Sequence, residues 1–476
     1  GTAHAQPQAG RALQNDNRAP DGILRAGVLK LHLELREARW YPEADDGRGE
    51  IVQAFAEPGK PATIPGPLIR VSTGTRIRAT VRNTLARDTL VIHGLGTRPG
   101  SSRDSLEVPP GALREVVFEV GASGTYYYWG STTGKSIGTR DGIDSQLSGA
   151  LIVDPSGSRP PRDRVFVIGV WHEERDTLGP KPWVDRDMMA INGKSWPHTE
   201  RFSFSQGDSV WWRWVNPSAD SHPMHLHGFY YDVSSRGGWP ADTAYRPSDR
   251  RRVVTELMLP GSTMTMRWRA ERPGNWLFHC HFAFHVSQFL SFDKVPNPAD
   301  PGAPDSVHHT AHRMRGLVLG LAVRPRESVY GSPTRAAQNV RARAIRLIAT
   351  ALPADGARGD STRAEPYAYV VDDGSDAPRA PTAPGAALVL ERGTPVRITV
   401  VNRLRAPTAV HWHGIELEQS FSDGVPAGAA RPVIWRRPSL RATPSLPSSR
   451  HAAPGLSSCT RTPTRATRLA PVCTTR

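Results

Sequence analysis

Hydrophobic and polar positions alternate along much of the chain, in the pattern expected of strands with one buried face. Between residues 29 and 36, leucine occupies every second position, and lysine, histidine, glutamate and arginine occupy the positions between. Because side chains on a strand point alternately to its two faces, this segment predicts a half-buried strand. Glycine and proline, at 43 residues each, supply the turns that short strands require. The pattern therefore predicts an all-β fold.

A unit of similar pattern occurs three times. Each copy opens with a glycine, continues through a strand-like segment that ends at asparagine, and closes with a His-Gly pair. The copies span residues 74–94, 207–228 and 393–414. Repetition at the scale of a domain predicts tandem copies of one β-sandwich.

The repeat and the composition divide the chain into five segments. We expect a disordered N-terminal segment (1–22), a first sandwich (23–157), a second sandwich (158–325), a partial third sandwich (326–426) and a tail (427–476). The tail is rich in arginine, proline and serine, contains no aspartate or glutamate, and shows no strand alternation. Such a shift is typical either of a frameshifted or misassembled end or of a disordered basic tail.

The formal net charge is +15, which raises the question of nucleic-acid binding. No basic stripe with interleaved aromatic residues accompanies the charge, so we expect a solvated arginine-rich surface and no nucleic-acid partner. No apolar run is long enough to span a membrane. Residues 3–5 (Ala-His-Ala) are either the small-residue end of a signal peptide or part of an ordinary alanine-rich terminus. The first interpretation predicts a periplasmic or secreted protein.

Cys280 stands among histidines in a segment that we expect to be a strand followed by a loop. On the strand, His279 and His281 point to one face and Cys280 points to the other. His285 can fold back beside the sulfur, and His222 offers a second imidazole. A thiolate with two histidines and a weak or absent axial group is the ligand set of an electron-transfer copper site.

Cysteine is rare, with three residues in the whole chain. Cys459 and Cys473 lie in the tail, so no disulfide framework is expected in the folded region, and the lone thiol of Cys280 is better explained as a metal ligand. Three further histidines lie in a Pro/Asp-rich loop that either binds zinc or copper or is merely solvated: His308, His309 and His312.

Three segments carry a family resemblance. Residues 222–228 (His-Pro-Met-His-Leu-His-Gly) and 279–290 resemble the third and fourth copper-binding motifs of multicopper oxidases, the laccase-like enzymes built from cupredoxin domains. Residues 411–414 (His-Trp-His-Gly) resemble the first motif. The resemblance implies tandem cupredoxin-like Greek-key β-sandwiches, two complete and a partial third.

The resemblance also implies two kinds of copper site. A type 1 copper would be held by His222, Cys280 and His285, with Leu290 at the axial position, where it cannot coordinate. The type 2 copper would bind His225 and His411. The type 3 pair would be held in part by His227, His279, His281 and His413. In the first sandwich only His93 remains at a motif position, which makes that sandwich a structural copy without copper.

Asp423 matches an acidic position near the copper cluster of relatives. A carboxylate there can relay protons to reduced oxygen. Asp423 also precedes a glycine, so the alternative is an ordinary Asp-Gly turn.

The implied function is that of a copper-dependent oxidoreductase. Such an enzyme couples the one-electron oxidation of a phenolic or similar small reducing substrate to the four-electron reduction of O2 to water. The family's cluster uses eight histidines, and the sequence provides six, so a homo-oligomer would have to supply the others from another chain. The alternatives are a copper-binding electron-transfer protein, an inactive fragment with an incomplete trinuclear cluster, and a copper nitrite reductase-like enzyme.

Overall fold

The computed structural model describes residues 9–157, 161–173, 187–287, 290, 292, 314–326, 342–352, 367–372 and, with short gaps, 381–424. Strands dominate these residues, and the short helical turns are of the 3-10 type. This confirms the predicted all-β class. Among the described residues, no helix has the length and apolar character needed to cross a membrane.

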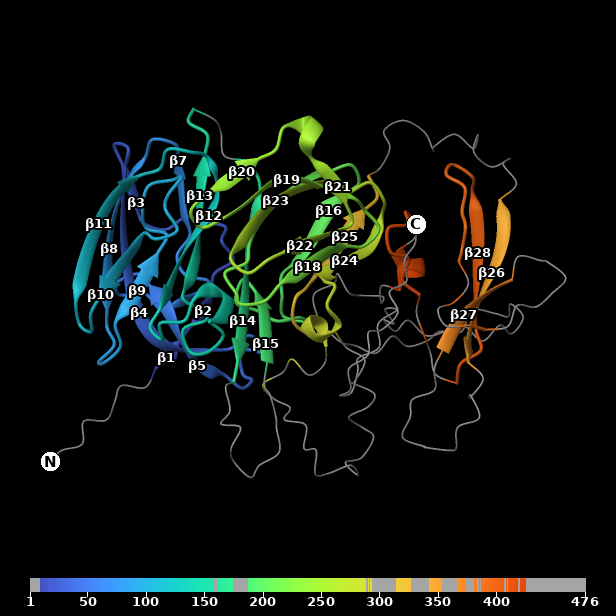
Figure 1. The fold of residues 1–476 in the computed structure, drawn as a ribbon, viewed down its shortest axis with the longest axis horizontal. Helices are drawn as coiled ribbons and strands as arrows, with labels where there is room; N and C mark the ends of the chain where they lie inside the picture. Colours follow the sequence, from blue (N-terminus) through green and yellow to red (C-terminus); the bar gives the residue numbers. More distant parts are fainter. Residues whose placement is uncertain are drawn as a thin grey trace, which may run out of the picture.

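The first part of the chain forms two packed sheets (Figure 1). One sheet holds eight strands: β1 (Gly10–Arg11), β2 (Leu13–Gln14), β3 (Ile23–Arg25), β4 (Val28–Trp40), β5 (Glu50–Ala56), β6 (Thr63–Ile64), β8 (Arg76–Asn83) and β11 (Leu113–Glu119). The other holds five: β7 (Ile69–Ser72), β9 (Leu90–His93), β10 (Ser105–Val108), β12 (Gly124–Ser131) and β13 (Ser148–Asp154). A helical turn, η1 (Ile137–Thr139), precedes β13. The predicted alternation in β4 is confirmed, since its leucines enter the core between the sheets.

The second part repeats this two-sheet arrangement. Its larger sheet contains β14 (Arg164–His172), β15 (Asp187–Ile191), β17 (Ser209–Val215), β19 (Tyr231–Gly238), β20 (Asp242–Ala244), β21 (Arg251–Val253) and β23 (Ser262–Arg269). Its smaller sheet contains β16 (Arg201–Ser205), β18 (His222–Leu226), β22 (Thr255–Met258), β24 (Gly274–Cys280) and β25 (Val318–Arg324). Two helical turns are η2 (Pro247–Asp249) and η3 (Ala283–Val286).

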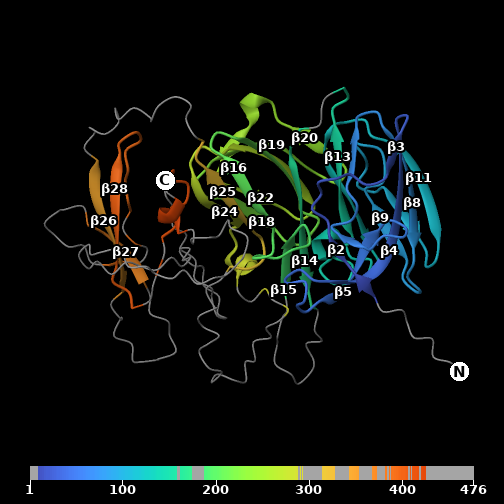
Figure 2. The same ribbon diagram turned by 180° about the vertical axis from the view of Figure 1, so that it is seen from behind.

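A third, smaller sheet follows, with the order β27 (Tyr367–Asp372), β26 (Arg343–Ala351) and β28 (Val396–Asn402). Seen from either side, it lies at the end of the molecule away from the first two sheets (Figure 2). The turn η6 (Ser420–Asp423) contacts β24, which brings the end of the described chain to the second sandwich.

The asparagine that ends each repeated strand has a common structural role. The side-chain oxygens of Asn83, Asn216 and Asn402 accept hydrogen bonds from the backbone N–H two residues further on, at 3.0, 3.3 and 3.0 Å. Each asparagine thus fixes the turn that leaves its strand. This local bond explains why the same residue type recurs at this point of the repeat.

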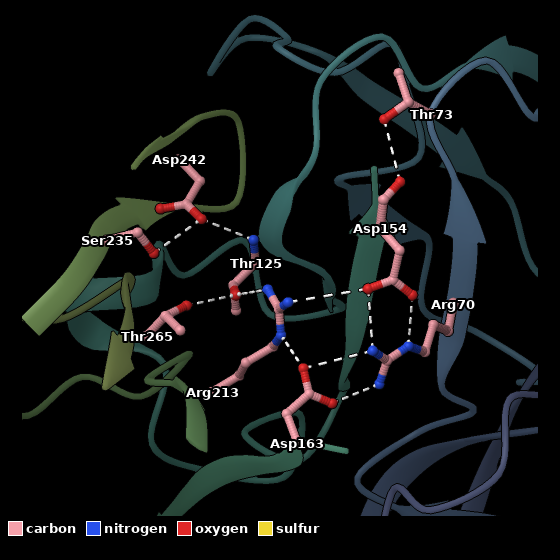
Figure 3. Close-up of polar contacts among 9 residues, drawn as sticks. All are labelled: Arg70, Thr73, Thr125, Asp154, Asp163, Arg213, Ser235, Asp242 and Thr265. Carbon is pink, nitrogen blue, oxygen red and sulfur yellow. Dashed lines mark hydrogen bonds and ion pairs between the residues drawn. The ribbon is translucent and has the colours of Figure 1, made fainter. Parts of the chain in front are cut away.

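The first two sandwiches share a buried interface. Aromatic and aliphatic side chains from both form one cluster that includes Tyr127, Trp129 and Trp239. Beside it lies a polar network in which Arg70 on β7 and Arg213 on β17 both bind the buried carboxylate of Asp163 (Figure 3). Apolar packing and paired charges therefore join the two sandwiches.

The prediction of disorder over residues 1–22 is wrong for the described part of that segment. The N–H groups of Ala12 and Leu13 donate to Arg39 O and Ala62 O at 2.9 and 2.8 Å, so β1 and β2 extend the first sheet. Asn17 is buried and donates to Asn192 Oδ1 at 3.1 Å. Backbone hydrogen bonds hold these two-residue strands, and strands this short leave no hydrophobic period in the sequence.

Candidate metal centres

The register of two neighbouring strands places the predicted ligands on opposite faces of one sheet. β18 pairs antiparallel with β24, so that Met224 lies opposite Cys280 and His225 lies opposite His279. Because successive side chains alternate, Cys280 enters the core of the second sandwich, whereas His279 and His225 point out of it. Two candidate metal centres therefore lie on opposite faces of the same sheet.

Three donor atoms converge at the buried centre. Cys280 Sγ lies 3.3 Å from His285 Nδ1 and 3.8 Å from His222 Nδ1, and the two nitrogens are 3.1 Å apart. The turn η3 brings His285 back to the sulfur. The backbone N–H of His285 donates to Phe282 O at 3.0 Å and closes this turn. All three ligand side chains are buried. The structure thus brings together the three residues predicted for the thiolate site.

Hydrogen bonds set the tautomer of His222. The hydroxyl of Ser218 donates to Asn216 Oδ1 at 2.6 Å, so its oxygen is left to accept from the Nε2–H of His222 at 3.1 Å. A neutral imidazole with its proton on Nε2 has its lone pair on Nδ1. That lone pair faces Cys280 and His285, as a metal ligand requires.

Burial also acts on the protonation of this centre. Burial lowers the pKa of His285 to about 4 and lowers that of His222 well below its usual value, so both imidazoles are neutral near pH 7. Burial raises the pKa of the Cys280 thiol to about 12. A thiolate at this place therefore needs a cation beside it, which a bound metal ion supplies.

Six imidazoles gather on the other face of the sheet. His225 Nε2 lies 3.1 Å from His411 Nε2, and His227 Nε2 lies 2.9 Å from His279 Nε2. The ring of His413 stacks on that of His225, with 4.4 Å between centroids. The sixth ring, that of His281, lies edge-on to His413 at 4.8 Å. Residues far apart in the sequence, from the second sandwich and from the 411–413 segment, thus form one histidine cluster.

The carboxylate of Asp423 contacts this histidine cluster. The Nδ1–H of His227 donates to Asp423 Oδ2 at 3.0 Å, and the Nδ1–H of His411 donates to Asp423 Oδ1 at 3.0 Å. Oδ1 also accepts from the backbone N–H of Trp412 at 3.1 Å. Asp423 is fully buried. It joins imidazoles from two separate segments and is more than a turn residue.

The hydrogen bonds of the cluster leave facing lone pairs that call for a cation. Carboxylate oxygens hold the Nδ1 protons of His227 and His411, and backbone carbonyls hold those of His225 and His279 at 2.9 and 2.7 Å. Every one of these rings therefore presents an Nε2 lone pair. Two lone pairs 2.9 to 3.1 Å apart repel each other unless a positive ion lies between them. The donor set consequently fits bound metal.

A narrow pocket, too tight to hold a water molecule, adjoins the His225–His411 pair. Its lining includes Tyr230, Val254 and Glu416. The hydroxyl of Tyr230 donates to Gly414 O at 2.8 Å, which ties the 411–414 segment to the second sandwich.

Leu290 is buried beside the thiolate centre. It belongs to the apolar core, and a Cβ atom built on Gly316 would lie 2.6 Å from Leu290 Cδ1 and 2.3 Å from His285 O. Glycine at position 316, with its positive φ of 69°, therefore leaves room for both residues. An aliphatic side chain in this position offers no donor atom to a metal.

His93 has a different environment in the first sandwich. Its ring stacks on Trp129 with 4.3 Å between centroids, and its Nδ1 lies 3.1 Å from Asp104 O. Trp129 thus occupies a position at which the second sandwich has a candidate metal-binding histidine. The candidate ligands His308, His309 and His312, and the tail cysteines Cys459 and Cys473, lie outside the described residues.

The sequence did not reveal three residues that support the ligands. Ser218 and Asn216 fix His222, and Thr255 contacts His225 and His413. Asn216 carried a signal, because it occupies the repeated asparagine position. Ser218 and Thr255 are common residue types whose role depends on cross-strand neighbours, which the sequence alone does not define.

Comparison with known proteins identifies the family of the chain. Two family models, both described as multicopper oxidase, match the chain, one at residues 173–299 and the other at residues 61–157 and 380–438. The chain belongs to the multicopper oxidase family, and copper is therefore its metal. The cysteine and histidine donors of the two centres suit that metal.

Individual relatives match parts of the chain. A probable nitrite reductase–hydroxylamine oxidoreductase fusion protein from Kuenenia stuttgartiensis is 25% identical over 54% of this chain and 30% of its own length. Laccase-1 from Melanocarpus albomyces is 32% identical over 24% of this chain and 22% of its own length. The blue copper oxidase of Nitrosomonas europaea has a TM-score of 0.45 and 19% identity, covering 62% of this chain and 85% of that chain. The chain spans less than a third of the length of these two curated relatives.

Proposed function

We propose that the chain is a copper oxidase that takes single electrons from a small reducing substrate and uses them to reduce O2 to water. The observation that carries the proposal is the covalent link between the two centres. Cys280 belongs to the thiolate centre, and its direct neighbours in the sequence, His279 and His281, belong to the histidine cluster. Copper supplies one-electron redox chemistry at the first centre and oxygen chemistry at the second.

The residues of the thiolate centre have distinct proposed roles. Cys280, His222 and His285 hold the type 1 copper, and Leu290 keeps the axial side apolar. His285 is the ligand nearest to solvent-exposed groups, since Asp220 Oδ2 lies 3.8 Å from its Nε2 and the rings of Phe282 and Phe284 lie against it. Substrate electrons therefore enter at His285.

The contacts between histidines of the cluster suggest which of them bind each copper ion. We assign His225 and His411 to the type 2 copper, and His227, His279, His281 and His413 to the type 3 copper ions. Asp423 accepts from His227 and His411, so it orients both rings and can hold a proton close to the place where oxygen is reduced. The described residues contain six of the eight histidines that the family's cluster uses. A second copy of the chain is our proposed source of the others.

The substrate class and the location of the oxidase are further proposals. Phenols and similar aromatic donors are the proposed substrate class. Export, to the periplasm or outside the cell, is the proposed location.

Oxygen consumption with a phenolic donor tests the proposed function. The copper-loaded chain is expected to consume O2 at a rate that depends on both donor and copper. Cys280→Ser, which removes the thiolate and leaves the histidine cluster, is expected to stop donor-dependent consumption. If the wild-type chain holds copper at both centres and consumes no O2, the proposal is wrong. Reduction of nitrite in place of O2 would favour the nitrite reductase alternative.

A further inference from the structure

Thr255 lies between two histidines that come from separate parts of the chain. Its Oγ1 is 2.9 Å from His225 Nδ1 and 3.1 Å from His413 Nε2. His225 belongs to β18 of the second sandwich, whereas His413 belongs to the segment that follows β28. One hydroxyl therefore contacts ring nitrogens on both sides of the boundary between the second sandwich and the third sheet.

The sheet register fixes the position of this hydroxyl. β22 pairs antiparallel with β18, and Thr255 lies directly opposite His225. His279 is the partner of His225 on the other neighbouring strand, so Thr255, His225 and His279 form one row across three strands. Directly paired residues of a sheet point to the same face. The Thr255 side chain is thus built into the face that carries the histidine cluster.

The hydrogen-bond chemistry restricts what each ring can offer to a metal. His225 Nδ1 also lies 2.9 Å from Val254 O, an acceptor, so Nδ1 carries the proton and Nε2 keeps the lone pair. For His413 to keep a lone pair for a metal, its Nε2–H must donate to the Thr255 oxygen, which leaves the lone pair on Nδ1. A valine at position 255 would remove the acceptor and leave His413 free to rotate or to change tautomer.

We propose that Thr255 is a positioning residue of the histidine cluster, which fixes the ring of His413 against that of His225 so that both present a lone pair to bound copper. This inference rests on the proposed function, because it assumes copper at the histidine cluster. Partners of metal-binding histidines that lie outside the ligand set typically change metal affinity by roughly 10- to 100-fold when they are removed. Thr255 is expected to act on the copper of the cluster and to leave the thiolate centre unchanged.

The test uses the full chain and Cu(II) alone, titrated in the presence of a competing chelator. Metal analysis measures total copper, and the blue absorption measures the copper of the thiolate centre and reports in the same sample that the second sandwich is folded. The difference between the two is the non-blue copper. Thr255→Val is expected to bind the non-blue copper about 10- to 100-fold more weakly, with the blue absorption unchanged. Thr255→Ser, which keeps the hydroxyl, is expected to restore wild-type affinity.

Thr263→Val is the matched control. Thr263 is a buried threonine of the second sandwich, and its hydroxyl has no hydrogen-bond partner among the described residues. Equal affinities for Thr255→Val and Thr263→Val would overturn the inference while leaving the proposed oxidase intact. Absence of non-blue copper from the wild-type chain would overturn both, because no copper would then be present for Thr255 to influence.

Discussion

The interface between the first two sandwiches makes a sharp prediction about stability. The side chain of Asp163 is fully buried and accepts from Arg70 Nη1 at 2.7 Å and from Arg213 Nε at 2.6 Å (Figure 3). Arg70 comes from the first sandwich and Arg213 from the second. The substitution Asp163→Ala removes the charge that both guanidinium groups share, and it is expected to destabilise the pair of sandwiches strongly.

The size of the effect follows from what remains after the substitution. Arg70 keeps two bonds to Asp154, at 2.8 and 3.0 Å, but Arg213 keeps only a 3.9 Å contact with Asp154 and a bond to Thr125 Oγ1 at 2.8 Å. Removing one partner of a buried ion pair typically costs about 3–5 kcal/mol. Because Asp154 still compensates part of the charge, we expect a loss of about 3 kcal/mol, at the lower end of that range. For domains of this size, such a loss lowers Tm by roughly 6–12 °C.

Thermal unfolding followed by circular dichroism measures the effect. Glu115→Ala is the control, since it removes an equally charged partner from the exposed Arg78–Glu115 pair, whose side chains are 54% and 39% exposed. Solvent screens such a pair, so Tm is expected to stay at the wild-type value. If Asp163→Ala and Glu115→Ala unfold at the same temperature, the buried network contributes nothing and the reasoning is refuted.

The remaining predictions concern the metal centres. Cys280→Ser is expected to abolish the blue absorption while metal analysis still finds copper at the histidine cluster; retained blue colour would exclude Cys280 as the ligand. Asp423→Asn is expected to lower the rate of O2 consumption by roughly 10²- to 10⁴-fold, because an amide can accept from only one of the two Nδ1–H groups that the carboxylate binds, and an unchanged rate would refute this role. Ser218→Ala is expected to weaken copper binding at the thiolate centre by about 10- to 100-fold in a chelator competition, since His222 loses the acceptor that sets its tautomer. Leu290→Met supplies an axial thioether and is expected to lower the reduction potential of the blue copper, as measured by spectroelectrochemistry; a higher potential would contradict the axial assignment.

Much of the fold could be predicted because its signals are local. The leucine alternation in β4 follows directly from burial of one strand face, and the repeated asparagines act on backbone groups two residues away. The segments around Cys280 likewise place thiol and imidazoles on opposite faces through the two-residue period of a strand. Residues that act through such short-range geometry can be recognised in a sequence.

Other features depend on contacts between distant segments and could not be predicted. β1 and β2 are held by backbone bonds to residues far along the chain, so their side chains carry no pattern. Thr255 reaches His225 only because β22 and β18 pair in one particular register. Asp163 gains its role from two arginines on different sandwiches. In each case the partner is chosen by tertiary structure.

Copper content measured together with the visible spectrum tests the central claim most directly. The claim is that one chain carries a thiolate copper centre and a histidine copper cluster on the two faces of a single sheet. The account predicts intense blue absorption together with more than one copper per chain, part of it non-blue. Blue absorption with a single copper per chain would contradict the oxidase and leave an electron-transfer site. A copper-loaded chain with no blue absorption would contradict the assignment of Cys280, His222 and His285.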